Sequence, residues 1–144
     1  MTNITCVVDS SIYASIMVRD EHYERARNFI TSHKRSELAT VATAFAEVAN
    51  ALWKHTYLLQ RVPEKSYQIL KNMVVPLIET STGWICEPTR LLSQALDVAA
   101  KYRITVYDAL FVALALRAKA KLASFDHKLR EALEAKGLDI VYVP

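Results

Sequence analysis

The chain has 144 residues, 52% of them hydrophobic, and a formal net charge of +3. This length fits one domain, expected to span residues 1–144, and the apolar content excludes an intrinsically disordered chain, while two glycines and four prolines are too few for an all-β protein with many tight turns. The first residues lack the pattern of a secretory signal, and no stretch approaches the roughly 18 apolar residues of a membrane span, so we expect a cytoplasmic protein without a membrane partner.

Short apolar runs alternate with helical patterns along the chain. In chain order we predict strand 4–8, a helix carrying Ile12, Ile16 and Met17, helix 20–32, strand 38–41, helix 43–59, helix 63–75, strand 84–86, helix 88–102, helix 106–118, strand 122–125, helix 126–135 and strand 140–143. Thr43 and Thr105 are predicted to cap the helices that follow them. Such alternation predicts a parallel sheet with helices on both faces.

Two aspartates directly follow predicted strands. Asp9 follows the strand over 4–8, and Asp126 follows the strand over 122–125. Right-handed crossovers bring strand-to-helix turns to one edge of a parallel sheet, where such folds bind ligands. Glu47 and Asp108 lie in the first turns of helices expected to begin near the same edge. The sequence therefore predicts four carboxylates that converge on one site.

Converging carboxylates repel one another, and burial raises the cost of their charges. A bound cation removes that cost, and Mg²⁺ and Mn²⁺ prefer oxygen ligands. Such ions can activate water and stabilise the leaving oxygen of a phosphodiester, so a protein nucleophile is not required. The four acids therefore point to metal-dependent phosphodiester hydrolysis.

Each acid also has a structural interpretation. Asp9 and Asp126 could be ordinary helix caps, Asp108 lies three residues after Thr105 as in a capping box, and Glu47 could favour the positive end of a helix dipole. Against this, Asp108 is the only charge between Val106 and Leu116. An isolated acid in so apolar a helix is costly unless it is paired or liganded.

Four segments resemble the PIN-domain family, and specifically the small VapC-type toxins of toxin–antitoxin pairs. They are Val7-Val8-Asp9-Ser10-Ser11, Ala46-Glu47-Val48-Ala49-Asn50-Ala51-Leu52, Tyr107-Asp108-Ala109-Leu110-Phe111-Val112-Ala113-Leu114-Ala115 and Ser124-Phe125-Asp126-His127-Lys128-Leu129. The resemblance covers the whole chain in order and spacing, and the third segment is the most specific.

The resemblance implies an α/β fold, a three-layer α/β/α sandwich with a five-stranded parallel sheet. It implies RNA cleavage with Mg²⁺ or Mn²⁺ as cofactor, and catalytic and metal-binding roles for Asp9, Glu47, Asp108 and Asp126. Ser11 and Ser124 match small polar positions that orient carboxylates or waters, although each could be a plain turn residue. The implied partners are an RNA substrate, an antitoxin protein and a second copy of the chain as a homodimer.

Other classes fit less well. A receiver-like switch needs a phosphoacceptor aspartate on a middle strand, an Asp-x-Asp phosphatase is disfavoured because Ser10 and Ser11 follow Asp9, and a nucleotide-binding module would need a glycine-rich loop. A stand-alone PIN nuclease in RNA processing and a non-catalytic PIN-fold binding protein remain as alternatives to a toxin. The four histidines share no ligand spacing and are expected at the surface: His22, His33, His55 and His127.

Two apolar groups are predicted to lie exposed, as partner surfaces do. One, on the helix over 43–59, consists of Trp53, Tyr57 and Leu58. The other follows Asp9 and consists of Tyr13, Ile16 and Met17. One surface could serve a homodimer and the other an antitoxin helix lying in a groove. The alternative is that these residues fill the core of a monomer, which is the preferred interpretation for Ile16.

Overall fold

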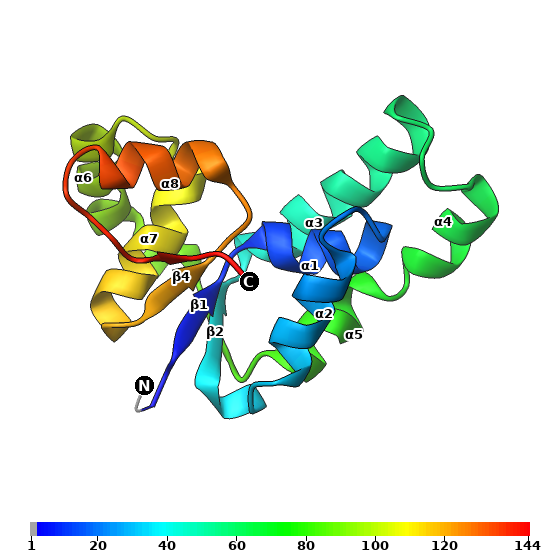
Figure 1. The fold of residues 1–144 in the computed structure, drawn as a ribbon, viewed down its shortest axis with the longest axis horizontal. Coiled ribbons are helices and arrows are strands. Elements are labelled where there is room, and N and C mark those ends of the chain that lie inside the picture. Colours follow the sequence, from blue (N-terminus) through cyan, green and yellow to red (C-terminus); the bar gives the residue numbers. More distant parts are fainter. Residues whose placement is uncertain (1–2) are drawn as a thin grey trace.

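Five parallel strands form the central sheet, in the order β3-β2-β1-β4-β5 (Figure 1). The computed structural model describes residues 3–144. The strands are β1 (Cys6–Val8), β2 (Leu38–Val41), β3 (Trp84–Cys86), β4 (Lys121–Ala123) and β5 (Val141–Tyr142). The predicted five-stranded parallel α/β fold is therefore confirmed.

Helices cover both faces of this sheet. They are α1 (Ser10–Val18), α2 (Tyr23–Thr31), α3 (Thr43–Trp53), α4 (Glu64–Leu70), α5 (Val74–Ser81), α6 (Leu92–Tyr102), α7 (Val106–Ala118) and α8 (His127–Glu134). Helix α7 packs on β1, β2 and β4, and α6 packs on α7, with α8 on the same side. Helices α1, α2, α3 and α5 pack together on the opposite side (Figure 1). This arrangement gives the three layers of the predicted sandwich.

Helix α7 explains why its segment is apolar nearly all round. Every residue from Ala109 to Ala115 is buried, because one side of the helix meets the sheet and another meets α6. The helix begins where predicted, with the hydroxyl of Thr105 accepting from the backbone N–H of Asp108 at 3.2 Å. The carboxylate of Asp108 thus stands in the first turn of a helix whose position is fixed by the core.

Several predicted boundaries were wrong. The helix expected over 63–75 is divided into α4 and α5, and the one expected over 43–59 becomes π-helical over Lys54–Leu58. Thr43 does not cap α3, because the helix includes Thr43 and its cap position is Ala42. The fourth strand begins one residue earlier and ends two residues earlier than expected, so Asp126 follows it after two intervening residues.

The two predicted apolar surfaces had different outcomes. Trp53, Tyr57 and Leu58 are exposed as expected, by 44%, 41% and 60%. The group after Asp9 was predicted wrongly, because Tyr13 is fully buried and Met17 is 4% exposed, so α1 turns these side chains into the core against α3. Among residues 3–144, no helix is long and apolar enough to cross a membrane.

Candidate active site

The two strand-end aspartates lie on neighbouring strands. β1 and β4 pair with Val8 beside Ala123, so Asp9 and the residues after β4 emerge at the same edge. From this edge the chain moves from β1 toward β2 and from β4 toward β5, which lie on opposite sides. Such a reversal is a topological switch point, where folds of this kind leave a crevice for ligands.

Ser11 links the segment after β1 to the segment after β4. Its hydroxyl donates to Asp9 Oδ1 and accepts from the backbone N–H of Phe125 at 3.0 Å. The backbone N–H of Asp9 donates to the carbonyl of Ala123 at 3.1 Å. Ser124, fully buried, accepts through Oγ from the backbone N–H of Asp126 at 3.0 Å. Both serines therefore fix the segments that carry the two aspartates.

Asp9 and Asp126 do cap helices, as their structural interpretation supposed. Asp9 Oδ1 accepts from the backbone N–H of Ser11 at 2.9 Å, and Asp126 Oδ1 accepts from that of Leu129 at 3.1 Å. In both residues the cap uses Oδ1, so capping does not occupy Oδ2. A capping role and a ligand role are therefore compatible in one carboxylate.

Glu47 and Asp108 approach from helices on opposite faces of the sheet. Asp108 lies in the first turn of α7, whereas Glu47 is the fifth residue of α3 and lies beyond the first turn in which it was predicted. Both side chains are partly buried. Helix α3 thus contributes Glu47, which lies near Asp9, and helix α7 contributes Asp108, which lies near Asp126.

The acids affect one another's protonation. Burial is the main cause that raises the pKa of Asp9 to about 6, and the charge of Asp108 adds to it. Burial likewise raises the pKa of Glu47 to about 7, with further contributions from Asp108 and Asp9. Burial and the charge of Asp126 raise the pKa of Asp108. Asp108 therefore interacts with each of the other three carboxylates, and the cluster resists full ionisation.

Whether these residues fit a metal ion is decided by their donor atoms. Glu47 Oε1 is buried without a hydrogen-bond partner, which is costly for a carboxylate oxygen unless a donor or a cation reaches it. All four side chains offer oxygen, the ligand that hard divalent cations prefer. Over residues 3–144, no three acidic, histidine or cysteine side chains are already arranged to hold an ion. The donor set fits a hard cation, and the carboxylates would have to move together to bind it.

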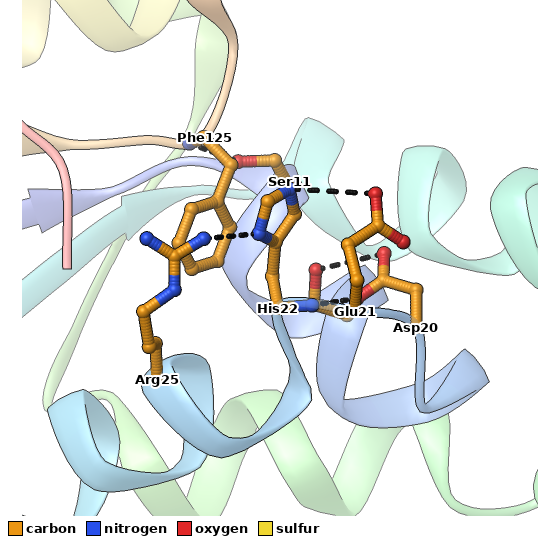
Figure 2. A network of polar contacts seen from close by, with 7 residues as sticks. Ser11, Asp20, Glu21, His22, Arg25 and Phe125 are labelled. Atoms are coloured by element: carbon orange, nitrogen blue, oxygen red, sulfur yellow. Dashed lines mark hydrogen bonds and ion pairs between the residues drawn. The ribbon is translucent and has the colours of Figure 1, made fainter.

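The contact of His22 and Arg25 with Phe125, beside the end of β4, was not predicted from the sequence. His22 was expected only as a surface residue, yet its ring stacks on Phe125, and Arg25 lies against both (Figure 2). Their positions in the sequence gave no sign of this contact, because it depends on α2 packing beside the end of β4.

The chain is similar in sequence and in fold to known PIN-domain proteins and toxins. A family model described as PIN domain matches residues 6–134. The chain is 37% identical over 131 residues to Ribonuclease VapC3 of Pyrobaculum aerophilum, covering 90% of this chain and 95% of that protein. The structure of PAE2754 from Pyrobaculum aerophilum has a TM-score of 0.71 at 21% identity, covering 97% of this chain and 90% of that one. A toxin–antitoxin complex from Klebsiella pneumoniae has a TM-score of 0.63 at 13% identity and covers 96% of each chain.

Proposed function

Because the chain belongs to the PIN-domain family, we propose that it is a metal-dependent endoribonuclease and the toxin of a VapBC-type toxin–antitoxin pair. The relative named Ribonuclease VapC3 matches nearly the full length of both proteins, which supports a nuclease that hydrolyses RNA. The alternatives, a stand-alone nuclease and a non-catalytic binding protein, differ from it in partner and in chemistry.

The observation that carries the proposal is the buried oxygen Glu47 Oε1, which has no hydrogen-bond partner and lies near enough to Asp9 and Asp108 for their charges to raise the pKa of Glu47. A binding protein without chemistry would gain nothing from acids whose burial raises the pKa of three of them. A hydrolase that uses divalent metal ions needs such a cluster, because the ion binds the charged form.

We assign metal-binding roles to Asp9, Glu47, Asp108 and Asp126, with Mg²⁺ or Mn²⁺ as the ion. When bound, such an ion supplies an activated water and stabilises the leaving oxygen of the phosphodiester. Ser11 fixes the orientation of the Asp9 carboxylate, since its hydroxyl donates to Asp9 Oδ1 and itself accepts from the backbone N–H of Phe125. Ser124 fixes the backbone at Asp126 in the same way.

The test of this assignment uses the metal in two measurements. RNA cleavage is expected to stop in a chelator and to return with Mg²⁺ or Mn²⁺, and the same ions are expected to raise the melting temperature because they bind only the folded state. Asp9→Asn keeps an oxygen that can accept from Ser11 but lacks the charge, so it should weaken both effects. Equal metal stabilisation of wild type and Asp9→Asn would reject the assignment.

We further propose that the antitoxin binds the exposed apolar surface formed by Trp53, Tyr57 and Leu58 together with a groove lined in part by α4, the helix whose Glu64 and Tyr67 contact Tyr57. The groove, of about 480 Å³, lies between the end of α1 and α4 and includes Arg19 and Arg61. Apolar walls with two arginines suit an amphipathic helix that carries acidic residues. The toxin–antitoxin complex from Klebsiella pneumoniae, whose fold is similar, supports a protein partner of this kind.

Co-expression with a protein encoded directly upstream tests the partner surface. Leu58→Glu is expected to prevent co-purification of that protein, because a charge would enter the apolar contact. Leu96→Glu is the matched control, since Leu96 on α6 is 57% exposed against 60% for Leu58. Identical co-purification of both variants with the upstream protein would contradict this surface.

The homodimer remains a prediction, and analytical sedimentation of the purified protein tests it. A strictly monomeric protein at tens of micromolar would contradict a homodimer.

A further inference from the structure

The guanidinium of Arg25 packs against the aromatic rings of Phe125 and His22, close to the end of β4. The rings of His22 and Phe125 are stacked, with centroids 4.4 Å apart and planes inclined by 13°. The guanidinium carbon of Arg25 lies 5.2 Å from the centroid of Phe125, and Arg25 Nη2 contacts His22 Nδ1 (Figure 2). Stacking and this hydrogen bond restrict the flexible arginine to one region of the surface.

The protonation pattern of His22 follows from its neighbours. An arginine nitrogen only donates, so His22 Nδ1 accepts and the ring proton is on Nε2. That nitrogen lies 3.7 Å from Glu21 Oε1, beyond hydrogen-bond distance. The backbone N–H of His22 donates to Asp20 Oδ1 at 2.9 Å and anchors the residue at the start of α2. His22 is thus held so that one ring nitrogen faces Arg25.

Phe125 and Ser11 connect His22 and Arg25 to Asp9. Phe125, which supports His22 and Arg25 with its ring, donates through its backbone N–H to Ser11 Oγ, and the same hydroxyl donates to Asp9. Phe125 is also the residue before Asp126. The guanidinium of Arg25 is therefore linked, through the ring and backbone of Phe125, to the segments that carry Asp9 and Asp126.

The charge of Arg25 is available to such a molecule. Arg25 is exposed, and within residues 3–144 no acidic side chain forms an ion pair with it. The contact with His22 uses one of the five N–H donors of a guanidinium. The remaining donors form the planar fork that matches the oxygens of a phosphate, and the guanidinium keeps its positive charge.

We propose that Arg25 binds a backbone phosphate of the RNA strand next to the one that is cleaved, with His22 and Phe125 as positioning residues. The inference rests on the proposed ribonuclease function and adds a substrate contact to it. An anionic strand is repelled by the carboxylates until they are neutralised, so a fixed cation at the rim of the crevice favours the strand's approach and sets its register.

The test is binding of a labelled single-stranded RNA of mixed sequence to Asp108→Asn protein in Mg²⁺, where the strand stays intact. Arg25→Gln in this background is expected to weaken binding by roughly 10-fold and to reduce the slope of log Kd against log salt by about one phosphate contact. Arg27→Gln removes the same charge from an exposed position on the same helix, and it is expected to change neither quantity. His22→Phe keeps a ring on Phe125 but cannot accept from Arg25, so it should weaken binding without changing the slope.

The outcomes separate this inference from the function on which it rests. Wild-type protein that neither binds nor cleaves RNA would overturn both. Wild-type protein that cleaves RNA, with equal binding by Arg25→Gln and Arg27→Gln, would overturn the role of Arg25 alone. Loss of antitoxin co-purification in Arg25→Gln with unchanged RNA binding would also overturn it, because the arginine would then serve the protein partner.

Discussion

Replacing Asp108 with asparagine is expected to lower the rate of RNA cleavage by more than about 100-fold. Loss of a residue that only orients a metal ligand lowers activity by about 10- to 100-fold, and loss of a ligand itself should lower it further. Asp108 influences, or is influenced by, the charge of each of the other three carboxylates, so it occupies the centre of the cluster. The cap of α7 should survive, because Thr105 accepts from the backbone of Asp108 and not from its side chain. The metal-free variant should even be more stable than wild type, since one repelling charge is gone.

This combination distinguishes a ligand from a helix cap. Loss of a cap lowers stability, by about 1 kcal/mol, and leaves chemistry intact. Asp97→Asn is the matched control, because Asp97 is an exposed aspartate of the neighbouring helix α6 and should affect neither cleavage nor melting temperature. Cleavage assays and thermal melts of the three proteins decide the matter, and full activity in a folded Asp108→Asn protein would reject the catalytic assignment.

Stability of the metal-free protein is expected to fall as the pH rises from about 5 to about 8. The pKa of Asp9 is raised from 3.8 to about 6 and that of Glu47 from 4.5 to about 7. The folded state therefore binds protons more tightly than the unfolded chain, so the stabilisation is complete below pH 4 and is lost as pH passes 6 and 7. A tenfold difference in proton affinity between the two states is equivalent to about 1.4 kcal/mol. Solvent screening reduces the contribution of the half-buried Glu47, so the total loss should be a few kcal/mol.

Urea unfolding in a chelator at several pH values measures this loss. The double variant Asp9→Asn, Glu47→Gln keeps the shapes of both side chains without their charges, so its stability should vary much less over the same range. Mg²⁺ should restore the wild type most at high pH, where the carboxylates are charged. A double variant with the same pH dependence as wild type would show that other groups are responsible.

Much of the fold could be predicted from local patterns. The strand at Leu38–Val41 and the helix Val106–Ala118 lie where their apolar runs predicted them, because burial on both sides leaves a clear signal in the sequence. The division between α4 and α5 and the π-helical end of α3 were missed, since helical periodicity continues across both. The burial of Tyr13 was missed as well, because its hydroxyl pairs with that of Thr82, far away in sequence.

The candidate site divides in the same way. The positions of Asp9 and Asp126 followed from the rule that parallel strands end at one edge, and the switch point followed once the strand order was known. The stacking of His22 on Phe125 could not be predicted, because the two residues meet only through the packing of α2 beside β4. Short-range patterns identify residues that end an element, whereas contacts between distant surfaces need the assembled fold.

The pairing of β1 with β4 has a consequence during protein synthesis. Asp9, Glu47 and Asp108 have all been translated before Lys121 begins β4, yet the carbonyl of Ala123 and the N–H of Phe125 that hold Asp9 and Ser11 come from later codons. A nascent or prematurely terminated chain therefore carries most of the acids without the framework that gathers them. The candidate site is therefore incomplete until the chain has been synthesised past Phe125.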